Sequence, residues 1–312
     1  MPSQPFHGVL VPVLTPFTRS GDPDAERFVA FCRWLLDQGA GGLSVFGTTS
    51  EANSMSGAER MTLLDRLIEA GIPADKLMPG TGACSMTEAV SLVRHAVGHG
   101  CGGVLMLPPF YYKGVSDDGI FAFVSGVIDK VASAALRMYL YHIPPVAQVG
   151  YSVDLVGRLI KAYPETVVGL KDSSGDWSNT AALLERYPGF AVFPGSEVFL
   201  LDALRKGGAG CITASGNVNV PGIRKVYDNW RGPQADALQA DATALRLLCG
   251  DEIARLHQVG ANLLVAPQCR KTRCGWLRSN QRMQVLPQRC QIGGRDPVVK
   301  RLTFRRTRGC HG

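Results

Sequence analysis

Two patterns of apolar residues, one typical of strands and one typical of helices, alternate along roughly the first 230 residues of the chain. Short runs rich in Val, Leu and Ile, bounded by turn residues, predict buried strands. Eight such runs occur, at Gly8–Pro16, Gly42–Gly47, Leu77–Gly82, Gly103–Pro108, Arg137–Ile143, Val167–Lys171, Ala191–Pro194 and Cys211–Ala214.

The stretches between these runs have the spacing of amphipathic helices. Ser56 with Glu59, and Ser85 with Glu88, have the sequence pattern of capping boxes that open a helix. Helices are predicted over Asp24–Gln38, Ser56–Ala70, Ser85–Gly100, Asp118–Ala132, Ser152–Tyr163, Asn179–Tyr187, Val198–Lys206, Pro221–Trp230 and Gln234–His257.

This alternation predicts an α/β fold, a (β/α)8 TIM barrel followed by C-terminal helices. A doubly wound open sheet has the same alternation, but no G-x-G-x-x-G turn follows the first run and no Walker-type sequence occurs. We therefore expect a barrel catalytic domain over residues 1–230, a helical extension over 231–267 and an atypical tail over 268–312.

Composition separates the tail from the rest of the chain. The 312 residues carry a net charge of +7, yet residues 268–312 alone hold 12 of the 33 Lys and Arg and one of the 26 acids. The remainder is mildly acidic, so nothing in it suggests a nucleic-acid partner. The opening Met1–His7 lacks a basic start and an apolar run. We expect no signal peptide, no membrane segment and a cytoplasmic location.

The tail shows no apolar helical stripe and is expected to be poorly packed. It contains four cysteines without a C-x-x-C pair, which argues against a structural zinc site: Cys269, Cys274, Cys290 and Cys310. A basic arm for an acidic partner is one interpretation. A chain end read in a shifted frame is the other, and the missing periodicity favours it.

Polar residues follow the predicted strands at the face where barrels carry their chemistry. Lys171 ends one strand, Tyr141 lies one strand earlier, and Thr48 and Thr49 follow the second strand. Apolar walls around such a lysine favour the neutral amine, which can form a Schiff base with a ketone. Tyr141 could relay protons, Thr48 could orient the phenol, and N–H groups at Thr48 and Thr49 suit a carboxylate. Tyr111, Tyr112 and Glu197 also follow predicted strands and are expected at this face.

Each of these residues also has a structural explanation. Lys171 could begin a solvated loop, Tyr141 could be a tyrosine that only contacts water, and Gly47–Glu51 could be the turn before a helix. On neighbouring strands of one barrel they form a coherent set for Schiff-base chemistry on a 2-oxo acid.

Three stretches resemble the signatures of the dihydrodipicolinate synthase / N-acetylneuraminate lyase family: Gly47–Glu51, Tyr141–Pro144 and Gly169–Ser173. Thr15-Pro16-Phe17 fits as well, and the resemblance covers roughly residues 6–260. It implies a class I, pyruvate-dependent aldolase, a carbon–carbon lyase or synthase that acts on pyruvate or another 2-oxo acid plus an aldehyde.

The resemblance also implies roles for single residues. Lys171 matches the Schiff-base lysine, Tyr141 the proton-relay tyrosine and Thr48 its hydroxyl partner. Thr49 matches a second carboxylate-binding position, and Ile212 a position whose carbonyl faces the site. Glu197 is a further candidate for substrate binding.

Family members bring a tyrosine into a neighbouring subunit's site, so Tyr111 or Tyr112 is expected in that role, in a homotetramer or homodimer. The family's chemistry needs no cofactor. No metal site is expected, because the six histidines form no ligand cluster in sequence, which leaves a class II aldolase without support.

Two departures concern the second substrate. No arginine occurs between Pro144 and Arg158, where synthases acting on aspartate semialdehyde carry one, and Ser50 replaces a glycine. We hypothesise that pyruvate chemistry is retained with another aldehyde, such as a sugar-acid or aromatic aldehyde. The alternatives are an authentic 4-hydroxy-tetrahydrodipicolinate synthase, an N-acetylneuraminate or 2-keto-3-deoxy sugar-acid aldolase or dehydratase, and a non-catalytic barrel that binds 2-oxo acids.

Overall fold

The structure is a computed structural model that describes residues 5–259, with side chains up to Leu247. The tail prediction for residues 268–312, including its four cysteines, lies outside the described residues. Within residues 5–259, no helix combines the length and the apolar character that crossing a membrane requires.

Parallel strands make up two sheets. The first has the order β2-β1-β7 and the second β3-β4-β5-β6. Every pairing within them is parallel, and nearly all of the strand residues are buried, as is usual for parallel sheets. The strands are β1 Gly8–Pro12, β2 Gly42–Ser44, β3 Val104–Met106, β4 Met138–His142, β5 Val167–Asp172, β6 Ala191–Pro194 and β7 Gly210–Ile212.

The segment Leu77–Gly82, predicted as a strand, joins the two sheets through isolated parallel bridges. The N–H of Met78 donates to Leu43 O at 2.9 Å, and the N–H of Leu105 donates to Pro79 O at 2.8 Å. Pro79 has no N–H to donate, which limits a regular ladder here. The segment therefore takes the eighth place in the barrel without forming a full strand.

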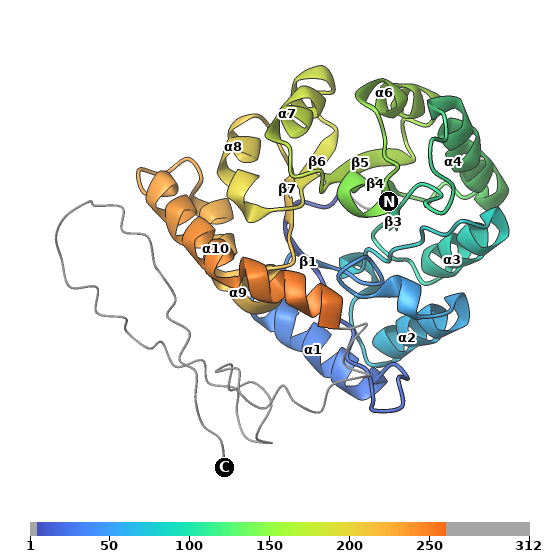
Figure 1. The fold of residues 1–312 in the computed structure, drawn as a ribbon, viewed down its shortest axis with the longest axis horizontal. Helices are drawn as coiled ribbons and strands as arrows, with labels where there is room; N and C mark the ends of the chain where they lie inside the picture. The colour runs from blue at the N-terminus through green and yellow to red at the C-terminus, as the bar shows by residue number, and fades with distance from the viewer. Residues whose placement is uncertain (1–4, 260–312) are drawn as a thin grey trace, which may run out of the picture. The chain divides into compact units, whose positions relative to one another are not determined.

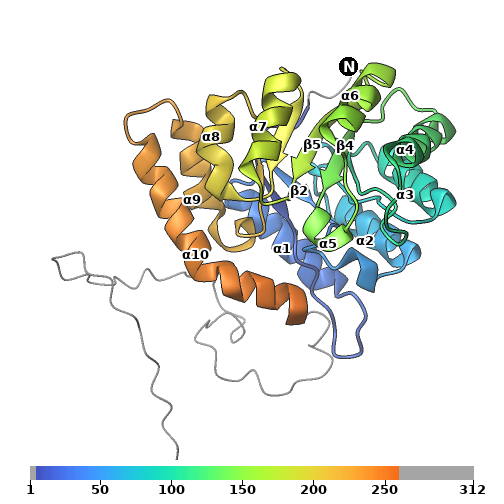
Figure 2. The same ribbon diagram turned by 45° about the horizontal axis from the view of Figure 1, so that its top comes forward.

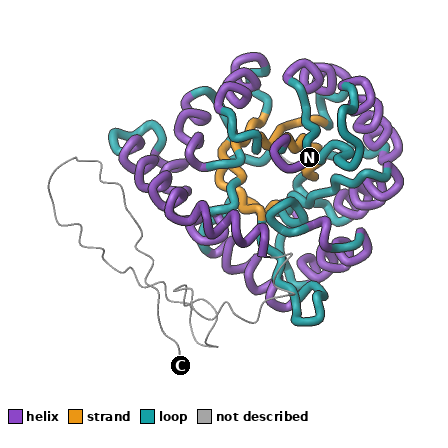
Figure 3. Tube along the Cα trace, in the orientation of Figure 1, coloured by secondary structure: helices purple, strands orange, loops and turns teal. Residues whose placement is uncertain are grey.

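The opposite seam lies between β6 and β7. Ala209 N–H donates to Val192 O at 3.0 Å, so hydrogen bonds link the two sheets at this seam too. Helices surround the strands in Figures 1 and 3. The predicted (β/α)8 barrel is confirmed, and each helix returns the chain to the start of the next parallel strand.

The helices agree with the predicted periodicity to within a few residues, except near prolines. They are α1 Ala25–Asp37, α2 Gly57–Glu69, α3 Met86–Gly98, α4 Asp117–Val131, α5 Pro144–Ala147, α6 Val153–Ala162, α7 Trp177–Arg186, α8 Leu200–Arg205, α9 Gly216–Asn229 and α10 Ala235–Val259. Short 3-10 turns span Ala52–Ser54, Ala74–Lys76 and Glu197–Phe199.

Two helices differ from the prediction. Helix α5 was not predicted, and its two prolines occupy the first helical positions, where a missing N–H costs nothing. Helix α9 begins five residues before the predicted Pro221, because the chain kinks at Asn219 (φ −141°, ψ 42°) and continues. The Asn219 side chain accepts the N–H of Gly222 at 3.2 Å and so stabilises the kink.

Strand alternation decides which side chains face the barrel interior. In β4 and β5, Leu140 and Leu170 pack under the helices, whereas Tyr141 and Lys171 lie on the opposite side of their strands. Tyr139 also faces inward and accepts the N–H of Phe6 through its hydroxyl at 2.7 Å. The neighbouring strands β4 and β5 thereby place Tyr141 and Lys171 side by side in the barrel interior.

Candidate active site

Lys171 lies near the carboxyl end of β5, where its Cα pairs with that of Tyr141 on β4. Only 3% of the residue is exposed, and Nζ lies 4.4 Å from the centroid of the Tyr141 ring. Among the described residues, no hydrogen bond or ion pair occupies Nζ. The amine is therefore buried against an aromatic face and available to a ligand.

Tyr141 connects this lysine to the loop that follows β2. Its hydroxyl donates to Thr48 Oγ1 at 3.2 Å, and the residue is 4% exposed. Thr49 is also buried, and both threonines line the same cavity as Lys171. The structure thus brings together the lysine, the phenol and the two threonines that the sequence singled out.

Ser50, where the family pattern has glycine, holds the threonine loop against the residue that follows β1. Its hydroxyl donates to Val13 O at 2.5 Å and accepts the N–H of Gly47 at 3.2 Å. Glu51 follows in the left-handed region at φ 55°, and burial raises the pKa of its carboxyl. The serine is fully buried, so this departure has a packing role rather than a contact with the cavity.

The cavity around Lys171 has a volume of ≈ 220 Å³. That is below the roughly 300–1,000 Å³ of pockets that hold drug-sized molecules, so it suits a small metabolite. Hydroxyl groups and an apolar wall share the lining: Pro12, Thr48, Thr49, Tyr141, Ile143, Val146, Lys171, Asp172, Ser173, Gly175, Thr180, Gly195, Ser196, Phe199, Ile212, Ala214 and Arg246. Ile212 is among these lining residues, and a role for its carbonyl stays a prediction.

Asp172 fixes the end of the lysine strand. Its carboxylate accepts the Ser174 N–H at 2.9 Å, the Asn179 amide at 2.9 Å and the Thr180 hydroxyl at 2.6 Å. Asp172 is 3% exposed, so these donors replace water around its charge. The contacts anchor β5 to the start of α7 and set the position of the neighbouring lysine.

Replacing Asp172 with alanine should lower the free energy of unfolding by about 2–4 kcal/mol, because buried donors lose their acceptor. Urea denaturation measures the change. The matched control is Asp176→Ala, which removes the exposed N-cap of α7 and should cost clearly less, because water can replace the lost acceptor. Equal losses in both variants would contradict the anchoring role.

His142, the last residue of β4, is held in its neutral form. Burial lowers its pKa from 6.5, an effect that the charge of Asp172 opposes only partly. The Nδ1 atom accepts the N–H of Tyr151 at 3.0 Å, which needs the unprotonated nitrogen. The imidazole is thus a structural acceptor beside the site.

Stability should therefore fall as the pH drops below about 6.5, since the unfolded chain binds this proton more readily than the folded protein. Above that pH the contribution of His142 is complete. The variant His142→Asn retains an acceptor without titrating. Urea midpoints from pH 8 to pH 5 should decline more steeply for the wild type than for this variant, and parallel curves would refute the assignment.

Three predicted site residues lie outside the cavity lining. Tyr111 and Tyr112 are 73% and 70% exposed on the loop after β3, with their rings 5.2 Å apart. Glu197 is 1% exposed and accepts a hydrogen bond from the Thr213 hydroxyl. The structure brings none of them to Lys171 within the single chain, and it gives Glu197 a partner inside the protein.

Arg246 is a cavity residue that sequence reasoning missed. It belongs to α10 and donates from a guanidinium nitrogen to Ser215 Oγ at 2.9 Å. Helix α10 lies beside α8 and α9 (Figure 2). No motif surrounds Arg246; the only signal was its spacing from Ala235, Gln239 and Ala242 on one helical face.

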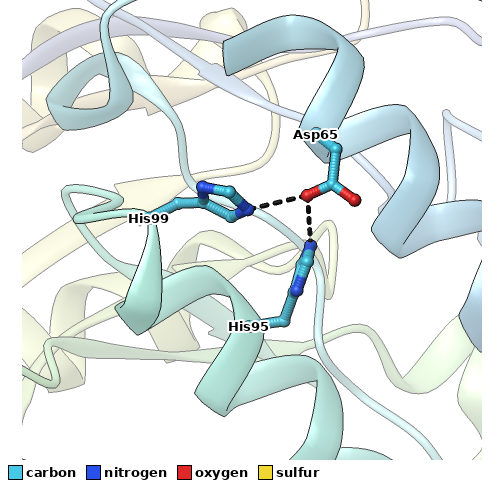
Figure 4. A group of neighbouring side chains, drawn as sticks. All are labelled: Asp65, His95 and His99. Atoms are coloured by element: carbon cyan, nitrogen blue, oxygen red, sulfur yellow. Dashed lines mark hydrogen bonds and ion pairs between the residues drawn. The ribbon is translucent and has the colours of Figure 1, made fainter. Parts of the chain in front are cut away.

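One group of described side chains could hold a metal ion, although none of them lines the cavity. His95 on α3 and His99, which caps the end of that helix, both direct Nε2 at Asp65 Oδ1 on α2, at 2.9 Å and 2.7 Å (Figure 4). Sequence inspection found no cluster among the histidines because the carboxylate comes from another helix. The expectation that the protein has no metal site stays a prediction.

Comparison with known proteins agrees with this architecture. The model of the dihydrodipicolinate synthetase family matches residues 5–258. An uncharacterized DapA-like lyase of Chloroflexus aurantiacus is 36% identical over 241 residues, which cover 77% of this chain and 80% of that protein. Residues 1–4 and the segment beyond 258 lie outside the family match.

Two solved structures share the fold. The crystal structure of dihydrodipicolinate synthase from Agrobacterium tumefaciens has a TM-score of 0.67 at 30% identity, with 83% of this chain and all of that chain covered. YagE from E. coli K12, solved in complex with pyruvate, has a TM-score of 0.73 at 24% identity, with 83% and 88% covered. This chain belongs to the dihydrodipicolinate synthetase family.

Proposed function

We propose that this protein is a pyruvate-dependent class I aldolase, which makes or breaks a carbon–carbon bond through a Lys171 Schiff base. The observation that carries the proposal is the free Lys171 amine, buried against the ring of Tyr141, whose hydroxyl is bonded to Thr48. Membership of the family and the pyruvate complex of YagE support the choice of substrate.

The reaction follows from these positions. Lys171 Nζ attacks the 2-oxo carbon, and the carbinolamine loses water to give the imine. Tyr141 passes the protons that these steps require, with Thr48 holding its hydroxyl in place. Loss of a proton from the methyl group gives an enamine, whose carbon adds to an aldehyde. Hydrolysis of the resulting imine frees the product and the lysine, and the reverse sequence cleaves it.

The carboxylate of the 2-oxo acid is assigned to Thr48 and Thr49, through their N–H groups at the edge of the cavity. Helix α5 presents Val146, 61% exposed, and no basic residue. This favours an aldehyde other than aspartate semialdehyde over authentic 4-hydroxy-tetrahydrodipicolinate synthase activity. Sugar-acid aldolase or dehydratase activity is the second candidate, since hydroxyl groups of Ser173, Thr180 and Ser196 line the cavity.

Borohydride trapping tests the proposal. Sodium borohydride added with pyruvate should reduce the imine and leave a pyruvate adduct that peptide mapping places on Lys171. Protein treated with borohydride alone provides the baseline. A folded protein that forms no adduct with pyruvate or with a panel of other 2-oxo acids would be a binding barrel rather than an aldolase.

A second copy of the chain is assigned to the surface around Tyr111 and Tyr112. Both rings are largely exposed, which is unusual for large aromatic side chains. A homodimer or homotetramer would cover them and bring one of them to a neighbouring cavity. A cytoplasmic location stays a prediction.

A further inference from the structure

Among the described residues, two cationic side chains line the cavity, and the proposed function uses only Lys171. The other is Arg246, half-buried on α10. A guanidinium has five N–H donors, and the described residues satisfy Arg246 only through Ser215 Oγ at 2.9 Å. Two other arginines have carboxylate partners: Arg205 pairs with Asp236 at 3.0 Å and Arg224 with Asp228 at 2.7 Å.

The acidic lining residue does not neutralise Arg246. Asp172 is the acidic residue among the described residues that line the cavity. Its carboxylate already accepts three hydrogen bonds, from Ser174, Asn179 and Thr180. A half-buried guanidinium without a carboxylate partner favours a bound anion, which it can grip with two parallel N–H donors. The charge of Arg246 is thus available to a ligand.

Helix α10 is held so that Arg246 reaches the cavity. Ala235, Gln239, Ala242 and Arg246 share one helical face, and the two alanines are buried. The Gln239 amide donates to Glu197 O at 2.9 Å and accepts the Leu201 N–H at 3.0 Å. These bonds fix the rotation of the helix, so Arg246 follows from the same face two turns later.

We propose that Arg246 binds the anionic end of the second substrate, so that the aldehyde partner carries a carboxylate or phosphate at a distance from its carbonyl carbon. This inference rests on the proposed function, because it assumes an enamine formed at Lys171. Thr48 and Thr49 are assigned to the carboxylate of the 2-oxo acid, which leaves Arg246 for a second anion. The cavity of ≈ 220 Å³ favours the smaller carboxylate.

The test compares matched aldehydes with pyruvate and the full-length protein. Succinic semialdehyde is set against butyraldehyde, and glyceraldehyde 3-phosphate against glyceraldehyde. The wild type should prefer one anionic member by about 10- to 100-fold in kcat/KM, as expected for a charge-assisted pair. The variant Arg246→Gln should lose that preference, and Arg246→Lys should restore part of it.

Borohydride trapping with pyruvate separates the two proposals. Arg246→Gln should trap pyruvate at the same half-saturating concentration as the wild type, and the control Arg231→Gln should match the wild type in every assay. Arg231 stacks on Trp230 outside the cavity lining. No trapping in the wild type defeats the proposed function. Normal trapping without an anion preference, or weaker pyruvate trapping in Arg246→Gln, defeats only the role of Arg246.

A different observation concerns the group Asp65, His95 and His99. Two imidazoles one helical turn apart meet a carboxylate from the next helix, and all three donor atoms lie within 4.8 Å of one another. Ligands of a tetrahedral zinc ion lie about 3.3 Å apart, so small side-chain rotations would open the group around an ion. We infer that it binds a divalent transition metal, with nitrogen ligands that favour Zn²⁺, Co²⁺ or Ni²⁺ over Mg²⁺.

Metal titration of the full-length protein tests this site. Zn²⁺ should bind saturably and raise the melting temperature, Co²⁺ should give visible absorption, and Mg²⁺ should do neither. The double variant His95→Asn with His99→Asn should lose this response. The control His7→Asn, which changes an exposed histidine, should retain it. A response that persists in the double variant, or no response in the wild type, overturns the assignment.

Discussion

Lys171→Ala should form no pyruvate adduct and should lose kcat/KM on the order of 10⁴-fold or more, because the nucleophile itself is removed. Lys171 is the only lysine of β5, so the strand offers no second amine to take its place. Lys171→Arg should be as inactive, since a guanidinium keeps the charge without becoming a nucleophile. Steady-state kinetics and borohydride trapping measure both effects.

Lys113 is the matched control for this result. Its Nζ donates to the carbonyl groups of Phe110 and Ala147, the latter at 2.8 Å. These hydrogen bonds engage the amine within the protein, so it is not available to a ligand in the cavity. Lys113→Ala should retain the adduct and most of the activity. An adduct that maps to Lys113, or that survives in Lys171→Ala, would show that the Schiff base forms elsewhere.

Tyr141→Phe should reduce kcat by about 10²- to 10³-fold, while slow trapping of pyruvate continues. The change removes one hydroxyl but leaves the ring on which Lys171 Nζ rests at 4.4 Å. Thr48→Val, which removes the acceptor of the Tyr141 hydroxyl at 3.2 Å, should cost about tenfold. Rapid-quench trapping separates imine formation from turnover.

The two changes should not add. If Thr48 acts by holding the Tyr141 hydroxyl, the double variant should be no worse than Tyr141→Phe alone, because the shared proton path is already lost. Independent, additive losses would mean that Thr48 contributes through substrate binding alone. A fully active Tyr141→Phe would remove the phenol from the mechanism.

The sequence predicted those parts of the molecule that depend on local periodicity. Strand ends identified Lys171, Tyr141 and the threonines, because a parallel barrel gathers such ends at one face. Each of these residues is marked by its place at the end of one predicted strand, and the regular barrel then brings the strand ends together. The cavity position of Ile212 was implied by the family resemblance instead.

Features that join distant segments escaped prediction. Arg246 reaches the cavity from α10, a helix that Gln239 holds against Leu201. The Asp65 carboxylate meets two histidines 30 or more residues later, across a helix–helix contact that no short pattern encodes. Glu197 follows a strand as an active-site residue would, yet it is bonded to Thr213. Helix rotation and side-chain direction decide all three cases.

The hydrogen bonds by which Gln239 fixes α10 also affect how such an enzyme can evolve. The groups assigned to bond making sit on β4, β5 and the loop after β2, whereas Arg246 comes from the last described helix. Substitutions in α10 can therefore exchange one aldehyde for another while the imine machinery stays intact. A barrel of this kind can therefore acquire new products through changes in α10 alone. Mutant libraries restricted to that helix are an efficient way to search for such products.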